Sequence, residues 1–338
     1  MGGDKRWRRQ PPGANWGAFG DDDQIGRLNL ITPERVLAAV REVQAGVVFS
    51  LSLPLDRPGG RVLTPHRFPP RLSSITRKGC CYFHFEYRRE NPDWRDVVSD
   101  DSVELSTQYS TQWDGLAHVG QLFDADADGL AEAVYYNGYR ADRMAPPEAR
   151  APGETPPLGI EHAAATGLQG RGVLVDLARR FGRARVLVDG AMLRGILAED
   201  GIDVIEGDIL CLHTGFADML MEMGGQPDAA ALAQGCAVLD GTCPDLLDWI
   251  TASGVAAIAA DNYAVEAVPP RPDRPAGALL PLHAHCLFKL GIHLGELWFL
   301  SDLARWLERH GRHSFLLTAP PLRLPGAVGS PVNPVATV

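Results

Sequence analysis

Apolar residues follow a strand or helix spacing through most of the second half of the chain. Short apolar runs indicate buried strands at 172–177, 207–216, 255–261 and 313–322. Apolar residues at helical spacing indicate helices at 190–201, 243–254 and 301–311, and a shorter one that ends at Gly291. Ser301 stands where the N-cap of the third helix is expected. Strands that alternate with helices in this way predict an α/β fold.

The first half is richer in expected strands. Thr32 has the properties of a helix N-cap, and the helix that it opens is expected to end at Gly46. An apolar strand is expected at 47–55, and an aromatic-rich strand at 78–88. His84 lies among the aromatic residues of that second strand, so we interpret it as a core or strand-face histidine.

Two segments differ in composition from the rest. Residues 1–20 combine a basic cluster with Pro and Gly, which predicts a flexible N-terminal arm ahead of a single domain over 21–338. Residues 124–160 are rich in Asp, Gly and Pro, and a long loop of this kind is often a lid over a site. Its acids at 124, 126 and 128 resemble a calcium loop, but Tyr135 occupies the position of the bidentate Glu, so no calcium site is expected.

Composition and charge narrow the functional classes. The 338 residues are 45% hydrophobic and 22% charged, with a net charge of −10, so binding of nucleic acid is not expected. The chain has no apolar run long enough for a membrane span, and its first residues lack the apolar core of a signal peptide. We therefore expect a cytoplasmic protein whose six cysteines are reduced.

The segment "STQWDGLAHVG" at 110–120 is the first candidate site. It places Asp114 and His118 four residues apart among small residues. A carboxylate and an imidazole close together can hold a divalent metal or act as an acid–base pair. The same spacing also occurs in ordinary hydrogen-bonded turns.

A second polar cluster follows in "PLHAHCLFKLGIHLGELW". If this segment is helical, His283 and His285 point in nearly opposite directions, so only one of them faces a site. If it is a strand, both face the same way. Gly291 and Gly295 interrupt any helix between His293 and Glu296, and the candidate set is therefore one of the first two histidines together with Glu296.

Polar residues also end two of the apolar strands. His213 lies in the strand at 207–216, and Asp261 and Asn262 follow the strand at 255–261. Strand ends in α/β sheets are common sites, but a structural role is the preferred interpretation for these residues. Sequence motifs for nucleotide binding, for a serine-hydrolase nucleophile and for a zinc protease are missing, so no organic cofactor is expected.

Taken together, the ordered segments resemble the Putative cyclase family, which includes bacterial kynurenine formamidase, isatin hydrolase and some polyketide cyclases. The resemblance runs from "WGAFGDDDQIGRLNLITPERV" through "GVLVDLA" and "GDILCLHTGF" to "HCLFKLGIHLGELWFLSDLA" and "GAVGSPVNPVA". It implies a swivelling β/β/α domain with a barrel-like sheet. It also implies a homodimer or homotetramer.

The family signature is His-x-Gly-Thr-His-x-Asp-x-Pro-x-His, and the same frame reads "QYSTQWDGLAH" in this chain. Thr111, Asp114 and His118 match the signature. Four positions depart from it, namely Gln108 and Gln112 in place of the metal-binding histidines, Ser110 in place of Gly and Leu116 in place of Pro. A glutamine amide is a weak, neutral oxygen ligand and does not replace imidazole for zinc.

The resemblance then assigns roles to the residues that remain. One divalent ion, Mn, Mg or Zn, is expected on Asp114, His283 and Glu296, with weaker binding than in a member with both histidines. His118 and Asp114 are the expected catalytic residues. The expected substrate-binding residues are Gln108, Thr111, Gln112 and Trp113, the last as a flat wall for a cyclic substrate.

The activity expected from this set is hydrolysis of a small molecule. The bond is the carbon–nitrogen bond of an amide, formamide or cyclic imide, or else a lactone ester, attacked by a metal-bound or His-activated water. Ring closure or dehydration by the same residues acting without metal is the alternative enzyme class. A binding protein that keeps the pocket without catalysis is the third hypothesis.

Overall fold

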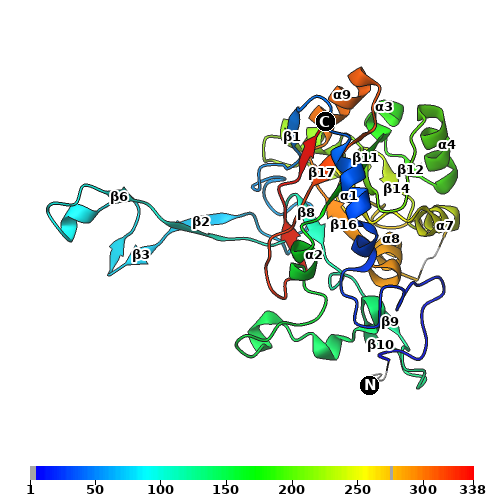
Figure 1. The fold of residues 1–338 in the computed structure, drawn as a ribbon, viewed down its shortest axis with the longest axis horizontal. Coiled ribbons are helices and arrows are strands. Elements are labelled where there is room, and N and C mark those ends of the chain that lie inside the picture. The colour runs from blue at the N-terminus through cyan, green and yellow to red at the C-terminus, as the bar shows by residue number, and fades with distance from the viewer. Residues whose placement is uncertain (1–4, 275–276) are drawn as a thin grey trace.

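A curled sheet that resembles half a barrel forms the centre of the molecule (Figure 1). The computed structural model describes residues 5–274 and 277–338, and within them this sheet has nine strands in the order β1-β19-β17-β11-β13-β15-β16-β8-β18. Strands β11, β13, β15 and β16 run parallel to one another, and the pairs on either side of them are antiparallel. The strand bounds are Val48–Ser50 (β1), Gln112–Asp114 (β8), Gln169–Asp176 (β11), Ile209–His213 (β13), Ala257–Ala260 (β15), His293–Glu296 (β16), Ser314–Thr318 (β17), Gly329–Pro331 (β18) and Val335–Thr337 (β19).

Helices cover the sheet and connect its parallel strands. Their bounds are Pro33–Val40 (α1), Glu161–Ala165 (α2), Leu177–Phe181 (α3), Gly190–Asp200 (α4), Phe216–Glu222 (α5), Ala229–Gln234 (α6), Pro244–Ser253 (α7), Pro281–His283 (α8) and Ser301–His310 (α9). Helix α8 continues into a π-helical turn at Ala284–Leu290, and a short 3₁₀ turn at Gly26–Leu30 precedes α1. A two-stranded sheet of β12 (Leu187–Val188) and β14 (Val238–Leu239) lies beside the main one.

The two faces of the sheet bury separate apolar cores, because successive side chains of a strand point to opposite faces. Val173 and Val175 of β11 belong to one core, which α4, α7 and α8 cover. Leu174 between them belongs to the other, which α9 and two buried tryptophans complete. This layered α/β arrangement around a sheet curled like half a barrel is the fold that the sequence predicts.

The second half of the chain follows the predicted order of elements closely, and two predicted helix ends, at α9 and at α1, differ locally. Ser301 is the first residue of α9 rather than its cap, and its hydroxyl donates to Asp218 at 2.7 Å. Helix α1 ends at Val40 and not at Gly46, because the N–H groups of Ala45 and Gly46 bond to the carbonyl of Val338 instead of continuing the helix.

The N-terminal segment is packed against the body over its described part. Trp7 and Trp16 are buried, and the indole of Trp16 donates to the carbonyl of Phe288 at 2.8 Å. Residues 5–20 are therefore packed and are not the flexible arm that composition predicts. The basic cluster indicates a solvated segment, but burial of the apolar area of two tryptophans fixes it to the body. Residues 1–4 of that expected arm lie outside the described residues.

The segment expected as a lid is partly structured. It holds β10 (Glu132–Val134), which pairs with β9 (Gln121–Phe123), and single helical turns at Tyr136–Gly138, Ala141–Arg143 and Pro147–Ala149. Tyr136 is fully buried in the core next to the π-helical turn that follows α8, which anchors this part of the segment. The role of residues 124–160 as a lid stays a prediction.

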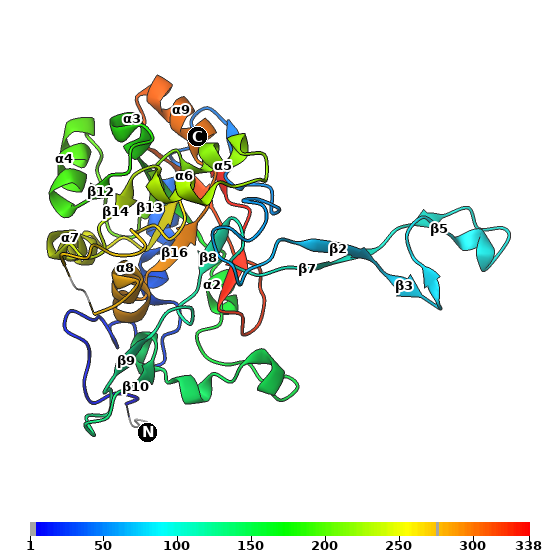
Figure 2. The ribbon, with the colours of Figure 1, turned by 180° about the vertical axis from the view of Figure 1, so that it is seen from behind.

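A narrow two-stranded arm projects from the body between β1 and β8, and both ribbon views show it standing clear of the sheet (Figures 1 and 2). Its stalk is the antiparallel pair of β2 (Arg71–Ser74) and β7 (Asp101–Glu104), with all eight of their residues exposed. We use "arm" for residues 71–104. Its tip carries β3 (Thr76–Arg77), β4 (Cys80–Cys81), β5 (Phe85–Glu86), a 3₁₀ turn at Tyr87–Arg89 and β6 (Val97–Val98).

The arm corrects the predicted strand at 78–88. That stretch is broken into β4, β5 and a turn because His84 adopts a positive φ of 54°, and His84 is exposed rather than part of a core or strand face. Aromatic side chains of the tip instead form a small cluster under the guanidinium of Arg77, 5.1 Å from the ring centre of Tyr82. The aromatic residues of this stretch therefore form a packed cluster and not a continuous strand.

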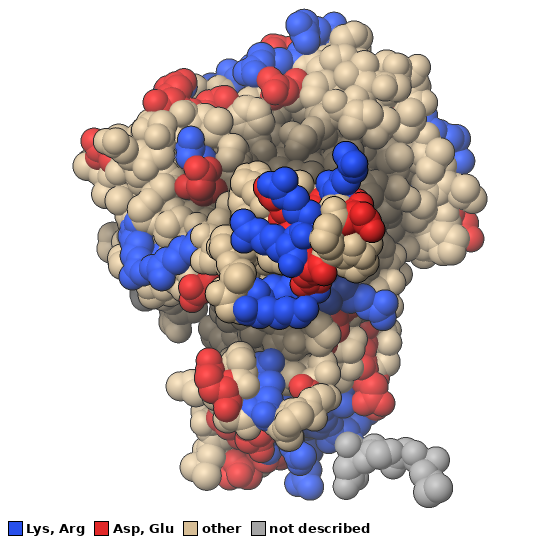
Figure 3. All heavy atoms as spheres, turned by 90° about the vertical axis from the view of Figure 1, so that its left-hand side faces the viewer, with Lys and Arg blue, Asp and Glu red and all other residues tan. Residues whose placement is uncertain are grey.

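Charges of both signs lie together at the end of the arm (Figure 3). They include the ion pairs of Arg77 and Lys78 with Glu90. The stalk, in contrast, presents Leu72 and Val103 directly opposite each other, with 72% and 52% of their surfaces exposed. An isolated two-stranded ribbon is at best marginally stable in water, so an exposed apolar pair on it favours packing against another surface. Among the described residues, no helix is long and apolar enough to cross a membrane.

We expect the arm to mediate the homodimer or homotetramer that the sequence predicts. Replacing the facing pair by charges, Leu72→Lys with Val103→Glu, keeps a favourable cross-strand pair while removing the apolar contact. The wild-type protein should have the mass of a dimer or tetramer by light scattering. The double variant should dissociate at protein concentrations at which the wild type is still assembled.

Leu122→Lys is the matched control, because Leu122 is 76% exposed on the β9–β10 hairpin of the body and is not part of the arm. It should leave the mass unchanged. A wild-type protein that is monomeric at all concentrations, or a double variant that assembles like the wild type, would refute this role of the arm.

Candidate functional site

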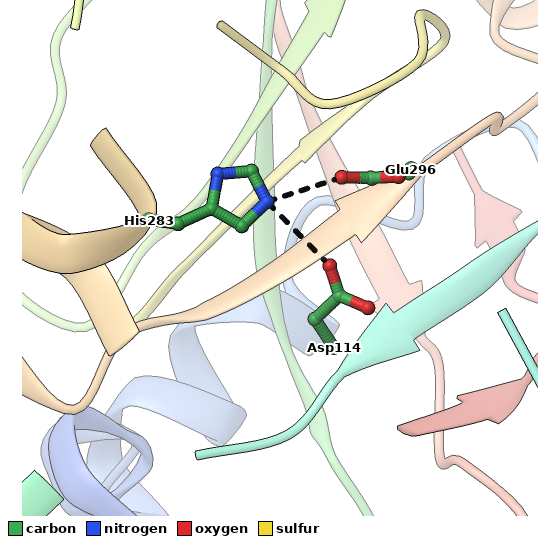
Figure 4. Close-up of side chains that lie close together, drawn as sticks. All are labelled: Asp114, His283 and Glu296. Atoms are coloured by element: carbon green, nitrogen blue, oxygen red, sulfur yellow. Dashed lines mark hydrogen bonds and ion pairs between the residues drawn. The ribbon is translucent and has the colours of Figure 1, made fainter. Parts of the chain in front are cut away.

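Three buried side chains converge at one end of the sheet (Figure 4). Asp114 comes from β8, Glu296 from β16 and His283 from α8. The Nε2 atom of His283 lies 3.3 Å from Oε1 of Glu296 and 3.8 Å from Oδ2 of Asp114. The structure thus brings together the three residues that the sequence analysis expects to hold a metal.

Strand register explains why the two carboxylates meet. β8 pairs with β16 in the antiparallel sense, with Gln112 opposite Glu296 and Asp114 opposite Leu294. Residues two apart on a strand share a face, so Gln112 and Asp114 point to the same side as Glu296, toward α8. Pro281 starts α8 and directs His283 onto that face from above.

Burial and charge set the protonation of the three groups. Burial of Asp114 raises the pKa of its carboxyl group, and the neighbouring charge of Glu296 adds to the rise. Burial opposes ionisation of Glu296 as well, but the hydrogen bond and charge of His283 outweigh it and lower the pKa of Glu296. Burial would lower the pKa of His283, yet hydrogen bonds to Glu266 and Glu296 raise it to about 10. Both ring nitrogens of His283 therefore lie against carboxylates, Glu266 at Nδ1 and Glu296 at Nε2, and this pairing favours the protonated imidazole.

Glu266 is a residue of the site that the sequence analysis misses. One of its carboxylate oxygens accepts from Nδ1 of His283 at 2.7 Å and from the His283 backbone N–H at 2.9 Å. The other accepts from the backbone of Leu282 at 2.8 Å. These contacts fix the ring so that Nε2 faces the two carboxylates, as second partners of metal-binding histidines do. An acid inside the apolar run "AVEAV" is the signal that could have indicated a buried carboxylate.

The two glutamines of the altered motif occupy different places. The amide nitrogen of Gln112 donates to Asp114 at 3.2 Å and to Glu296 at 3.1 Å, so this residue bridges the two carboxylates. Gln112 is fully buried. Gln108 lies nearer the surface, with its amide nitrogen 3.4 Å from Nδ1 of His118. Their expected role in binding substrate stays a prediction.

His118 lies on the turn after β8, at the edge of the cluster. Its Nε2 atom is 3.8 Å from Oδ1 of Asp114, and 21% of its side chain is exposed. It is therefore the imidazole of the site with access to solvent. The arrangement brings His118 and Asp114 together as the sequence analysis expects.

Thr111 and Trp113 have structural surroundings, in contrast to their expected contact with substrate. The Thr111 hydroxyl accepts from the backbone N–H of Leu53 at 2.9 Å and donates to the carbonyl of Leu297. Trp113 points to the opposite face of β8 from Asp114, where it is fully buried against Trp298 and donates to the carbonyl of Ala319 at 2.8 Å. A one-residue step along a strand reverses the face, so Trp113 cannot form a wall of this site.

The other histidines of the second cluster lie outside it. His285 points away from His283, as expected for a helix, and its Nε2 contacts the hydroxyl of Thr251 at 2.9 Å. His293 is buried at the start of β16, where burial lowers the pKa of its imidazole to about 3. His213 reaches Asp176 at 2.9 Å and the hydroxyl of Ser301 at 3.2 Å, so it joins the end of β13 to α9.

The donor set of the cluster fits a divalent cation. Oδ2 of Asp114 and Oε1 of Gln112 are buried without a hydrogen-bond partner among the described residues, although such atoms are normally satisfied. Two carboxylates and one imidazole are an oxygen-rich set that suits manganese or magnesium better than zinc. Asp124, Asp126 and Asp128 also lie close together, but their oxygens accept from Arg140 and from backbone N–H groups of their own loop.

A family model described as Putative cyclase matches residues 49–267. A crystal structure described as that of a novel cyclase is 33% identical, covers 98% of this chain and 100% of its own, and superimposes with a TM-score of 0.74. The chain therefore belongs to the Putative cyclase family. No curated protein matches it.

More distant structures share the fold. Isatin hydrolase A from Labrenzia aggregata, bound to benzyl benzoate, is 13% identical over 90% of this chain and 98% of its own, with a TM-score of 0.54. An isatin hydrolase bound to the product analogue thioisatinate is 14% identical over 91% of this chain and 99% of its own, also with a TM-score of 0.54.

Replacing Thr111 tests its structural role. Thr111→Val removes the hydroxyl while keeping the shape, and it leaves the buried N–H of Leu53 and the carbonyl of Leu297 without their partner. The free energy of unfolding, measured with denaturant, should fall by about 2 kcal/mol or more. Thr111→Ser keeps the hydroxyl and should lose less. If Thr111→Val unfolds at the same denaturant concentration as the wild type, these hydrogen bonds do not stabilise the site.

Proposed function

We propose that this protein hydrolyses the carbon–nitrogen bond of an amide, formamide or cyclic imide, or the ester bond of a lactone. The observation that carries the proposal is the position of His118, a partly exposed imidazole 3.8 Å from a buried carboxylate that is itself part of a candidate metal cluster. Acyl hydrolysis commonly uses an acid–base group beside a bound cation. Membership of the Putative cyclase family supports this reaction class.

In this proposal Asp114, His283 and Glu296 hold one divalent ion. When bound, such an ion supplies Lewis acidity that polarises a carbonyl group. Glu266 keeps the Nδ1 side of His283 occupied, so that the Nε2 lone pair is directed to the cluster. Gln112 is then a neutral neighbour whose amide nitrogen donates to both carboxylates.

His118 carries the proton in this proposal. As a base it takes a proton from the attacking water, and as an acid it returns that proton to the leaving nitrogen or oxygen. Asp114 stabilises the imidazolium between the two steps, because its Oδ1 lies beside Nε2 of His118.

Gln108 suits this proton transfer better than a charged residue would. An amide offers both a donor and an acceptor, and turning it over lets it bond to Nδ1 of His118 whether or not that atom carries a proton. The hydroxyl of Thr107, 2.7 Å from Oε1 of Gln108, can also donate or accept. Gln108 can therefore support both tautomers of His118.

The proposed ion can be tested by metal content. After loading with Mn²⁺ and dialysis, elemental analysis of the wild-type protein should find at most one ion per chain, with zinc held more weakly than in a site that has both histidines. Asp114→Asn should remove most of the ion. Gln108→His together with Gln112→His should raise the zinc content.

Asp124→Asn is the control, because it alters the other acidic group of the chain and not the cluster on β8 and β16. It should leave the metal content unchanged. Two tightly held zinc ions in the wild-type protein would refute the interpretation of the glutamines. Metal loss with Asp124→Asn, and not with Asp114→Asn, would refute the assignment of the site.

The catalytic role of His118 predicts a large loss of activity. Hydrolysis of aromatic formamides, isatin-like imides and lactones is measured with Mn²⁺, Mg²⁺ or Zn²⁺ present. For the substrate that reacts, His118→Asn should lower kcat by about a hundredfold to ten-thousandfold, with a smaller effect on KM.

His162→Asn is the matched control, because His162 lies partly exposed on α2 outside the cluster. It should keep wild-type kcat. If one of these compounds binds tightly but no bond is cleaved with any ion, the protein is a binding protein. If the product is a ring or a dehydrated compound, the alternative cyclase chemistry replaces hydrolysis.

A further inference from the structure

A small cavity lies at the carboxyl ends of β13 and β15, next to Glu266. It has a volume of about 260 Å³. Glu266, which holds His283, forms part of its wall. Most of the lining is apolar and comes from the segment before the arm, from α5 and α6, and from β14 and its neighbours, namely Val62, Leu63, Phe216, Leu232, Val238 and Val268. Ligand sites of open α/β sheets form at this edge, where parallel strands end.

One polar side chain of the cavity has an unused hydrogen-bond acceptor. Asn262 follows β15, lines the cavity and is only 1% exposed. Its amide nitrogen is fixed by donation to the carbonyl of Ala237 at 3.1 Å, while its Oδ1 atom has no hydrogen-bond partner among the described residues. A buried amide oxygen is normally satisfied, so this atom indicates a ligand with an N–H or O–H group.

The cavity also contains a cation without a counter-charge. Arg185 is half-buried on the wall, and its side chain contacts the carbonyl of Gly235 at 3.5 Å. Throughout residues 5–274 and 277–338, no carboxylate lies within 4.0 Å of its guanidinium group, whereas the nearby Arg183 is paired with Glu222. Burial lowers the pKa of Arg185, because a guanidinium charge is less favourable when it is partly removed from water. An anionic group on a ligand would offset that cost.

The acid in the wall does not cancel this charge. Both oxygens of Glu266 already accept from the backbone and ring of His283 and from the backbone of Leu282. Tyr263 also lines the cavity, and its burial together with the charge of Glu296 raises the pKa of its hydroxyl. The cavity and the metal cluster are therefore neighbours that share a wall.

We propose that this cavity is the specificity pocket of the site, and that it binds a single apolar ring or branched chain bearing a carboxylate. The carboxylate pairs with Arg185, the ring packs between Phe216 and Leu232, and an N–H or O–H group beside it donates to Oδ1 of Asn262. The identification of this ligand as a substrate rests on the proposed hydrolase function. Binding of the ligand in the cavity does not depend on that function. A volume of about 260 Å³ is at the small end of ligand pockets and suits a single ring.

Binding of two small probes tests the pocket without any assay of activity. Benzoate carries the ring and the carboxylate, and benzyl alcohol carries the ring without the charge. By calorimetry or ligand-observed NMR, benzoate should bind the wild-type protein more tightly than benzyl alcohol does. Arg185→Leu should weaken benzoate by about tenfold to a hundredfold, because a charge-assisted hydrogen bond is lost, and should leave benzyl alcohol nearly unchanged.

Arg183→Leu is the matched control, because Arg183 is two residues away and is paired with Glu222 outside the cavity. It should bind benzoate like the wild type. Ala233→Trp is a second variant, placed at an exposed lining position that can accept a larger side chain, and it should block both probes. This variant keeps the test decisive if Arg185→Leu fails to fold.

Each outcome bears on one part of the proposal. Equal binding of the two probes, or equal loss with Arg183→Leu, would overturn the role of Arg185. Binding of both probes that persists in Ala233→Trp would overturn the cavity as their site. Once a hydrolysed substrate is known, benzoate should inhibit competitively. Binding that depends on Arg185 but leaves hydrolysis unchanged would separate the cavity from the substrate site and still leave the hydrolase function intact.

Discussion

The balance of charge inside the buried cluster is the constraint on which the rest of the site depends. Asp114, Glu266 and Glu296 are removed from water almost completely, and isolated carboxylates in such a place would be costly. The imidazole of His283 compensates for two of them at once, with Glu266 on one nitrogen and Glu296 on the other. The short helix α8 and the register of β8 against β16 are therefore fixed by electrostatics as well as by packing. A divalent cation bound at the cluster would offset the same carboxylate charges.

Much of the second half of the fold is predictable, because its signals are local. Apolar runs mark β11, β13 and β15, and helical spacing marks α4, α7 and α9 within a few residues. The first half is less predictable. The aromatic stretch around His84 has the composition of a strand, but its turns depend on positive φ angles that cannot be predicted from its residue types. The exposed stalk of the arm lacks the alternation that comes from one buried face.

The candidate site shows the same division between local and distant information. Asp114, His283 and Glu296 follow from the resemblance to the family, and helical geometry predicts only that one of His283 and His285 faces the site, without saying which. Trp113 shows that motif position alone does not reveal which face of a strand is buried, since its neighbours Gln112 and Asp114 face the cluster while it faces the core. Glu266 and Arg185 belong to loops whose approach to the site depends on the folded sheet, so no local pattern identifies them.

The antiparallel joint between β8 and β16 also has a consequence for the order of folding. Gln112 and Glu296 are 184 residues apart in the chain and yet are hydrogen-bonded partners. Closing so long a loop costs conformational entropy, so we expect this contact to form after the pairing of the parallel strands. The parallel strands β11, β13 and β15 lie between them in sequence and can assemble without β8. An intermediate of that kind would have most of its secondary structure and no active site. The site would form only when β8 joins the sheet.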